Sequence, residues 1–307
     1  MSSAVFDHPG LLYHDLGEYL RGTTSFVRAA VAAGDAVLVA VPGANLGPLR
    51  DSLADLAAEV SFADMTVAGR NPGRIIPGVL LKFAAAHAGR RVSIIGEPIW
   101  PGRSEVEYPA CAAHEALINS VFAGRDAAIL CPYDAARLDR TRLHDAWRTH
   151  PVMIAGGGRR PSPWYADPLT TAARFNRPLP EVPQRAAAVS FAEVRDLARI
   201  RRFVTERAAR AGLPAERTDD LVAAVNELVE NTILHTAAGG VVSFWVEDAV
   251  VCQVDDHGHL SDVLAGRVPP DTHTEGGRGL LLANLLCDLV RIHTRPGGTS
   301  IRLQMGR

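Results

Sequence analysis

Short runs of consecutive apolar residues alternate with helix-like stretches through the first 160 residues of the chain. The clearest runs are Asp35–Val41, Arg91–Glu97 and Asp126–Cys131, and each is short enough to be a buried strand. The other elements expected from apolar spacing are helices over 16–31, 46–58, 76–87 and 106–122 and a short strand near residue 60. Near-continuous apolar strands separated by helices are what a parallel sheet covered on both faces requires. The pattern therefore predicts a doubly wound α/β domain.

Polar and aromatic residues gather where these predicted strands end. In doubly wound folds the loops leaving the carboxyl ends of the strands form the ligand crevice. Six residues there are candidates for a sensory pocket: Glu97, Trp100, Arg103, Cys131, Tyr133 and Asp134. The alternative is that the prolines, glycines and aromatic rings only stiffen the turns. Cys131 could be a sensing thiol, although a cysteine within an apolar strand is more often buried and inert.

A proline-rich stretch follows the first domain. Residues 156–185 contain three consecutive glycines and then prolines at 161, 163, 168, 178, 180 and 183. This density of proline disfavours helix interiors and central strands, which predicts an extended, semi-rigid connector. Trp164 and Tyr165 are bulky for a free connector, so part of it should dock on one domain. We place the domains at 1–160 and 186–307, with the linker over 161–185.

The last 120 residues have a different order of elements. An edge strand over 186–191 is followed by a helix from Leu197 to Ala211 and a second helix that begins after Pro214. Alternating apolar strands are expected over 241–246 and 250–254, then a helix over 280–286 and strands over 289–293 and 299–303. This order predicts a second, separate domain.

Two polar residues flank the apolar stripe of the second helix in this domain. Glu227 and Asn231 are four residues apart, so they share one face of the helix. Asn231 offers a neutral oxygen suited to Mg²⁺, and Glu227 could accept a proton from an attacking hydroxyl. On its own, an E-x-x-x-N helix could equally be surface polarity.

A carboxylate and a glycine-rich turn complete the constellation. Asp256 stands at the end of a predicted strand, two residues before Gly258, and a carboxylate there can accept from an exocyclic amine such as that of adenine. Gly276–Gly279 opens a helix, whose free N–H groups can bind phosphate. Residues 259–275 are polar and have the composition of a flap that closes over a ligand. Asp255 is the other candidate carboxylate, but strand alternation favours Asp256.

Composition narrows the class of protein. The 307 residues are 47% apolar and 21% charged, with a formal charge of -2 and no apolar run near the ~20 residues that span a bilayer. The opening residues do not have the pattern of a secretion signal, and the near-neutral charge argues against direct nucleic-acid binding. Four widely spaced cysteines form no C-x-x-C pair, and no G-x-x-x-x-G-K-[ST] phosphate loop occurs. We expect a cytoplasmic protein without a membrane partner.

Residues 6–165 resemble the MEDS domain, a sensory module of bacterial regulators. The resemblance rests on the segments 96–103, 122–125, 130–134 and 149–151, which read Gly-Glu-Pro-Ile-Trp-Pro-Gly-Arg, Phe-Ala-Gly-Arg, Leu-Cys-Pro-Tyr-Asp and Thr-His-Pro. It implies a RecA-like fold without ATPase motifs and a proposed role in binding a small-molecule signal. It does not identify the signal.

Residues 186–307 resemble the GHKL ATP-binding fold, and specifically the RsbW-like anti-sigma factors that are serine protein kinases. The resemblance implies an α/β sandwich with a mixed, largely antiparallel sheet and helices on one face. It implies ATP and Mg²⁺ as cofactors, with Asn231 as the Mg²⁺ ligand, Glu227 as the catalytic base and Asp256 on adenine. Further binding residues implied by the motifs are Gly258 beside the base, the phosphate-binding Gly277, Arg278, Gly279 and Leu280, and, in second rank, His235 and Thr299.

The family also implies the partners. They are a sigma factor, which the protein would sequester, and an anti-anti-sigma protein with a STAS domain, whose serine would be phosphorylated. Histidine kinases share the GHKL fold but need a helical hairpin bearing the phosphoacceptor histidine just upstream, where this chain has the proline-rich stretch. A homodimer stays open as a further assembly.

One departure from the GHKL motifs leaves alternatives. The usual D-x-G-x-G has its second glycine replaced by His259, which could stiffen or obstruct the lid hinge. A protein that binds ATP but regulates by contact alone, without kinase activity, is therefore the first alternative. The second is that the N-terminal half is an enzyme or small-molecule receptor in its own right, with the GHKL half as an interaction module.

Overall fold

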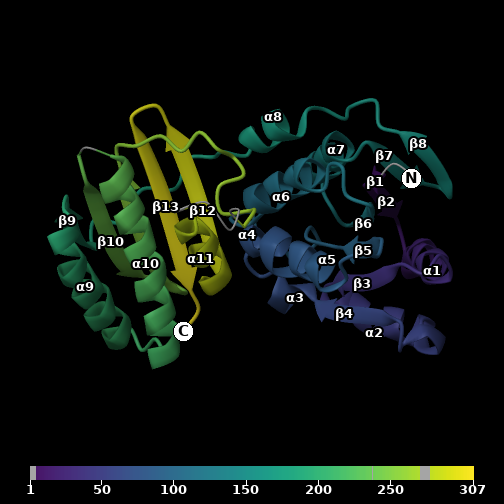
Figure 1. Ribbon diagram of the computed structural model, residues 1–307, viewed down its shortest axis with the longest axis horizontal. Helices are drawn as coiled ribbons and strands as arrows, with labels where there is room; N and C mark the ends of the chain where they lie inside the picture. The colour runs from purple at the N-terminus through teal and green to yellow at the C-terminus, as the bar shows by residue number, and fades with distance from the viewer. Residues whose placement is uncertain (1–4, 237, 270–276) are drawn as a thin grey trace. The chain divides into compact units, whose positions relative to one another are not determined.

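The computed structural model describes residues 5–236, 238–269 and 277–307. The chain divides into two compact units, residues 1–175 and 176–307 (Figure 1). None of the described helices is both long and apolar enough to cross a membrane.

The first unit is built on an eight-stranded sheet. Along the sheet the strands follow the order β4-β3-β5-β6-β2-β7-β8, with β1 paired beside β6. Every pairing is parallel except that of β7 with β8. The strands are β1 (Phe6–Asp7), β2 (Pro9–Tyr13), β3 (Ala36–Val41), β4 (Val60–Asp64), β5 (Val92–Gly96), β6 (Ala127–Asp134), β7 (Val152–Ala155) and β8 (Gly158–Pro161).

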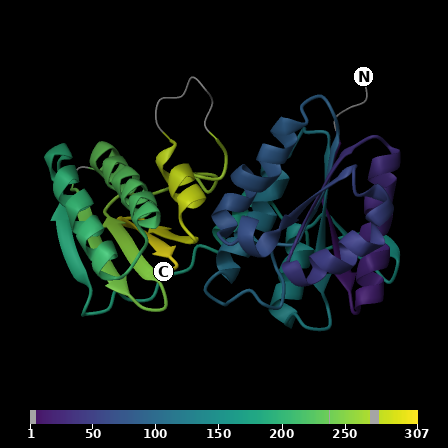
Figure 2. The same cartoon turned by 90° about the horizontal axis from the view of Figure 1, so that it is seen from below.

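Helices cover both faces of this sheet, which confirms the predicted doubly wound α/β architecture. Figure 2 shows α1 and α2, in purple, on one side of the sheet and the blue and teal helices on the other. All residues of β3 are buried because both of its faces are covered. The helices are α1 (Leu16–Ala32), α2 (Gly43–Ser52), α3 (Met65–Ala68), α4 (Pro72–Arg74), α5 (Lys82–Ala86), α6 (Tyr108–Val121), α7 (Arg140–Thr149) and α8 (Pro168–Ala173), with a 3₁₀ turn over Ala54–Leu56 and a π-helical segment over Ile75–Leu81.

Two features of this sheet depart from the sequence-based expectation. Strands β1 and β2 lie in a segment for which the apolar pattern predicts no strand, and β2 inserts between β6 and β7. Strand β6 also runs on to Asp134 and includes Pro132, although proline is normally excluded from strand interiors. Residues 131–134 are therefore part of the sheet and do not form the loop expected from the sequence.

The proline-rich stretch is ordered by docking and contains a helix. Helix α8 begins at Pro168, a position that proline tolerates because the first helical N–H needs no partner. Trp164 packs edge-on against Trp147, with ring centroids 5.3 Å apart. The expectation of an extended connector is thus wrong over α8, since prolines at helix starts do not break helices.

The second unit is a five-stranded sheet with its helices on one face (Figure 1). The strand order is β12-β13-β11-β10-β9, and all four pairings are antiparallel. The elements are β9 (Ala187–Phe191), a 3₁₀ turn (Val194–Asp196), α9 (Leu197–Arg210), α10 (Ala215–His235), β10 (Gly240–Val246), β11 (Val250–Asp256), α11 (Gly279–Leu286), β12 (Leu289–Arg295) and β13 (Gly298–Met305).

Strand alternation divides the residues of this sheet between two environments. Val242, Cys252 and Val254 face the helices and join a core with Leu221 and Val225 of α10. Residues in the other register, including Gln253, Asp255 and Arg302, cannot belong to that core.

The face of the sheet away from the helices is covered by the chain that precedes β9. Arg302 donates to Gln253 Oε1 at 2.7 Å and to the carbonyl of Pro180 at 2.6 Å, and its guanidinium lies 4.8 Å from the centre of the Trp245 ring. Asn176 bonds the backbone of Thr294. These contacts hold Asn176 and Pro180 against the sheet, so this part of the connector belongs to the second unit.

Candidate functional site

A cavity of about 400 Å³ lies in the second unit, beside the C-terminal half of α10 and the end of β11. Seven of the residues proposed for nucleotide binding line it: Asn231, His235, Asp256, Gly258, Gly277, Leu280 and Thr299. The rest of the lining comes from Leu228, Thr232, Thr236, His259, Leu260, Ala265, Gly266 and Ile301. The mix of apolar walls and a few converging polar groups is typical of a small-molecule site.

Asp256 is held in place at the base of this cavity. Its Oδ2 accepts from the Thr232 hydroxyl at 2.8 Å, and its Oδ1 accepts from the Gly258 N–H at 2.7 Å. Each carboxylate oxygen has a further lone pair for a ligand donor. Asp255 instead bonds Gln253 and Ser300 at 2.5–2.9 Å on the opposite face of the sheet. Alternation along β11 thus places only the second carboxylate of the pair in the cavity.

Glu227 and Asn231 meet the start of α11. A Cβ atom added to Gly279 would lie 2.6 Å from Asn231 Nδ2 and 3.0 Å from Glu227 Oε2. Glycine is therefore required at this position, and the amide, the carboxylate and the helix start are in direct contact. Burial, and then the nearby charge of Glu230, raises the pKa of Glu227. A raised pKa makes a carboxylate a stronger proton acceptor.

The chain before α11 has the backbone geometry of an anion site. Gly277 has φ +74°, which favours glycine, and the side chain of Arg278, at the N-cap, makes no capping hydrogen bond. As far as the described residues go, the first N–H groups of α11 are therefore available to a ligand. Gly277 and Arg278 are exposed, and Gly279 and Leu280 are buried. Gly276, which belongs to the same sequence motif, lies outside the described residues.

A chain of hydroxyl groups supports the wall opposite α10. Thr299 Oγ1 donates to the Gly258 carbonyl at 3.0 Å and lies 2.9 Å from Thr294 Oγ1. The ring of His259 lies 3.2 Å from the same Thr294 hydroxyl, which also accepts from the Leu260 N–H. His259, which replaces the second glycine of the motif, is thus hydrogen-bonded to Thr294 of β12 at the edge of the cavity.

Sequence reasoning missed two residues that organise this site, Thr232 and Thr294. Thr232 lies within the apolar stripe of α10, where the spacing predicts only a packing role, yet its hydroxyl orients Asp256. The available signal was a hydroxyl residue directly after the proposed metal ligand. Thr294 could not have been found, because its role depends on pairing with Thr299 across the β12–β13 hairpin.

The polar segment after His259 contributes to the site over its described part. Leu260, Ala265 and Gly266 line the cavity, and Asn284 of α11 donates to the Gly266 carbonyl at 3.0 Å. Residues 270–275 of the expected flap lie outside the described residues.

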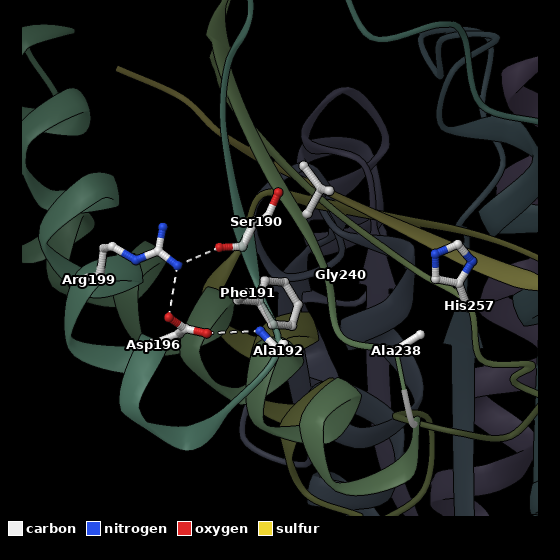
Figure 3. A pocket seen from close by; sticks show the side chains of 9 residues that line it. Ser190, Phe191, Ala192, Asp196, Arg199, Ala238, Gly240 and His257 are labelled. Atoms are coloured by element: carbon white, nitrogen blue, oxygen red, sulfur yellow. Dashed lines mark hydrogen bonds and ion pairs between the residues drawn. The ribbon is translucent and has the colours of Figure 1, made fainter.

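A second cavity of about 410 Å³ opens between β9, β10 and the start of α9 (Figure 3). Two of its charged side chains, Asp196 and Arg199, already make hydrogen bonds within the protein. Asp196 accepts from the Ala192 N–H at 2.9 Å and from Arg199 at 2.8 Å, and Arg199 also donates to the Ser190 carbonyl at 2.7 Å. These bonds fix the entry into α9.

In the first unit Glu97 is a fully buried carboxylate among the six proposed pocket residues. It is 1% exposed, and its oxygens accept from Asn45 at 3.0 Å and from the Tyr19 hydroxyl at 3.1 Å. Burial raises the pKa of Glu97 to about 8, against the lowering effect of the Asn45 and tyrosine hydrogen bonds. Asp134, at the end of β6, is close enough to raise it further.

Trp100 and Arg103 form a separate arrangement. The Arg103 guanidinium lies 4.0 Å from the centre of the Trp100 ring and donates to the carbonyls of Pro98, Arg70 and Gly69. It also pairs with Glu107 at 2.8 Å. These bonds staple the loop after β5 to the neighbouring turn and leave Arg103 few donors for a ligand.

Cys131 and Tyr133 are buried within β6, and their contacts are with histidines. Cys131 Sγ lies 3.4 Å from His8 Nε2, and the Tyr133 ring packs edge-on against His150. Burial, followed by the charge of Glu115, raises the pKa of the Cys131 thiol well above its usual value. The six residues therefore lie in three groups: Glu97 with Asp134, Trp100 with Arg103, and Cys131 with Tyr133.

Two family models match the chain in separate ranges. The sensory-domain model described as MEDS, MEthanogen/methylotroph, DcmR Sensory domain, matches residues 7–151, and the model of the histidine kinase-like ATPase domain matches residues 191–305. The chain is a MEDS domain joined to a histidine kinase-like (GHKL) ATPase domain. The ATPase-domain match includes every residue that lines the 400 Å³ cavity.

Similarity to individual proteins is limited. The search of curated proteins finds no match. Among solved structures, the RsbU and RsbW domains of Rv1364c from Mycobacterium tuberculosis match at 23% identity with a TM-score of 0.32. That match covers 40% of this chain and spans about a third, 33%, of the other. The histidine kinase-like ATPase domain implies ATP binding.

Proposed function

We propose that this protein is a signal-dependent anti-sigma switch in which the MEDS domain receives a small-molecule signal and the ATPase domain acts on protein partners. The observation that carries the proposal is the convergence of Asn231, Asp256, Gly258 and Gly277 on one cavity, with Glu227 beside it. Ligand binding to the MEDS domain would bias the partner-binding state of the ATPase domain.

The residues of the cavity fit ATP. Asp256 would accept from the adenine amino group, because both of its oxygens are oriented by bonds to Thr232 and Gly258 that leave lone pairs free. The N–H groups at Gly277–Gly279 would bind phosphate oxygens, and the requirement for glycine at 279 keeps them accessible. The neutral Asn231 oxygen would be a ligand of Mg²⁺.

The position of Glu227 supports phosphorylation of a partner serine. Its carboxylate contacts the start of α11, where the phosphates would lie, and its raised pKa suits it to take the proton of a serine hydroxyl. ATP supplies the phosphoryl group. In this scheme the serine belongs to a STAS-domain antagonist, and the unmodified antagonist competes with a sigma factor for the protein.

A second candidate is regulation by nucleotide-dependent contact alone, without kinase activity. The observation that favours it is the His259 ring, which lines the cavity edge and is fastened to Thr294 where the motif normally has glycine. A side chain there restricts the backbone of the segment that would close over the phosphates.

Phosphoryl transfer distinguishes the two candidates. The full chain is incubated with γ-labelled ATP, Mg²⁺ and a candidate STAS protein, beside the variants Glu227→Ala and Asn231→Ala and the matched control Glu216→Gln on the same helix. We expect label on the STAS serine, lowered roughly 10²–10⁴-fold without Glu227 and unchanged in the control. ATP binding without any transfer by the wild type would instead support the second candidate.

The role of His259 is tested in the same assay. The variant His259→Gly restores the glycine of the motif, so it should raise transfer if the ring restricts closure. Unchanged turnover would show that this side chain does not limit the lid. Normal transfer by Asn231→Ala would contradict the proposed Mg²⁺ ligand.

A further inference from the structure

Four buried side chains with metal-binding chemistry converge in the first unit. They are His8, between β1 and β2; Glu115 of α6; Cys131 of β6; and His150, which follows α7. All four have exposures of 0%. Their ligand atoms lie within 4.8 Å of one another, although the residues are up to 142 positions apart in the sequence.

Three of the six distances between these atoms are close to the edges of a metal tetrahedron. His8 Nε2 lies 3.4 Å from Cys131 Sγ and 3.5 Å from Glu115 Oε2, and Glu115 Oε2 lies 3.1 Å from His150 Nε2. Bonds of roughly 2.0–2.3 Å to nitrogen, oxygen and sulfur, arranged tetrahedrally, place neighbouring ligand atoms about 3.3–3.7 Å apart.

The outer nitrogens of both imidazoles are held by acceptors. His150 Nδ1 lies 2.8 Å from the Ala146 carbonyl, which can only accept, so this nitrogen carries the proton. His8 Nδ1 lies 3.0 Å from Asn119 Oδ1, and the Asn119 amide nitrogen donates to the Thr149 carbonyl at 2.8 Å, which fixes the direction of that amide. Both Nε2 atoms therefore present lone pairs to the cluster.

Three of the inner atoms, the two Glu115 oxygens and His150 Nε2, are left without hydrogen bonds among the described residues. The short contact between Glu115 and His150 lacks hydrogen-bond geometry. A carboxylate and imidazole lone pairs that face one another without donors are unfavourable in a dry interior. A cation among them satisfies all of these atoms at once.

We propose that His8, Glu115, Cys131 and His150 bind a first-row divalent transition-metal ion such as Zn²⁺. Two imidazoles, a carboxylate and a thiolate are ligands of the borderline softness that suits such an ion and not Mg²⁺ or Ca²⁺. Hydrogen bonds from the outer nitrogens to Asn119 and Ala146 are the supports that metal-binding histidines usually have.

Binding also has a consequence for the MEDS domain. Four protein ligands complete a tetrahedron, which is typical of a structural or sensing metal and not of a catalytic one. The ion displaces the thiol proton of Cys131 and ties β1, β2, α6, β6 and α7 together. Loss or exchange of the metal would therefore weaken the attachment of His8, and of strands β1 and β2 on either side of it, to the rest of the domain.

Metal binding by the untagged full chain tests the proposal. After chelator treatment, Zn²⁺ is titrated and the bound metal is counted by mass spectrometry, and Co²⁺ is added separately for spectroscopy. We expect one Zn²⁺ per chain, at least about 100-fold weaker binding in Cys131→Ser and His150→Gln, and about 10–100-fold weaker binding in Asn119→Ala. The matched control Cys111→Ser, a buried cysteine of α6 outside the cluster, should bind as the wild type does.

The Co²⁺ spectrum of the wild-type chain tests the ligand set without any variant, so the proposal can be refuted even if a variant fails to fold. The wild type should show the visible bands of tetrahedral cobalt and a near-ultraviolet thiolate-to-cobalt band. A wild-type chain that binds neither ion, or that binds Co²⁺ without the thiolate band, overturns the proposal, as does unchanged Zn²⁺ affinity in folded Cys131→Ser.

Discussion

Replacing Glu97 by glutamine should change how the stability of the MEDS domain depends on pH. Glu97 is buried, and its pKa rises from the ordinary 4.5 to about 8. The folded protein therefore keeps this carboxyl protonated between these values, whereas the unfolded chain releases the proton. The stabilisation is fully present below pH 4.5 and is lost as the pH rises toward 8.

The magnitude follows from the pKa. At 1.36 kcal/mol per pKa unit, the rise to about 8 corresponds to about 5 kcal/mol of unfolding free energy lost between pH 4.5 and pH 8. Glutamine has the shape of the neutral acid but does not titrate, so Glu97→Gln should not suffer this loss. The variant should be more stable than the wild type at pH 8.5, by a margin that disappears near pH 4.5.

Urea-induced unfolding followed by tryptophan fluorescence measures this difference. Three of the four tryptophans lie in the first unit, so a Trp245→Phe background restricts the signal to that unit. The exposed Glu59→Gln is the matched control and should parallel the wild type at every pH. A free-energy difference between wild type and Glu97→Gln that does not vary with pH would refute the reasoning.

Two further predictions concern the ATPase domain. Gly279→Ala places a methyl group against the Asn231 amide and the Glu227 carboxylate at the start of α11. The resulting overpacking costs about 1–3 kcal/mol, so ATP binding measured by calorimetry should weaken roughly 5–150-fold. The control Gly47→Ala, whose added methyl group meets nothing within 4 Å, should bind ATP normally. Arg302→Met removes the donors to Gln253 and to the Pro180 carbonyl, so it should lower the free energy of unfolding by about 2–3 kcal/mol. Urea titrations followed by circular dichroism measure this loss, and the exposed Arg295→Met is the control that should not show it. Equal stability of the two arginine variants would contradict the bridging role of Arg302.

The elements with strong local patterns could be predicted from the sequence. Continuous apolar runs such as Val92–Gly96 identified the buried parallel strands, because both of their faces need cover. Alternation along β11 also separated Asp256 from Asp255, since neighbouring residues of a strand face opposite sides. These inferences depend only on residues close together in the chain.

Features that depend on distant packing could not be predicted. Strand β2 is stabilised by neighbours on both sides, and Pro132 is tolerated in β6 although a local rule excludes it. The cluster around Glu115 joins four separate segments of the chain that carry one ligand each, so no spacing motif in the sequence indicates it. Arg103 was expected in a pocket, but carbonyl groups of two turns occupy its donors.

ATP binding through Asp256, in the cavity at the end of β11, can be tested by calorimetry on a pair of adjacent variants. The full chain is titrated with ATP and Mg²⁺, and Asp256→Ala is compared with Asp255→Ala, which removes the neighbouring carboxylate on the other face of the sheet. Loss of a hydrogen bond to a charged group, about 1.5–3 kcal/mol, predicts roughly 10–150-fold weaker binding for Asp256→Ala and near-normal binding for Asp255→Ala. GTP, which presents a carbonyl where adenine has its amino group, should bind the wild type far more weakly than ATP. Equal ATP affinity in the two variants, or no ATP binding by the wild type, would contradict the account.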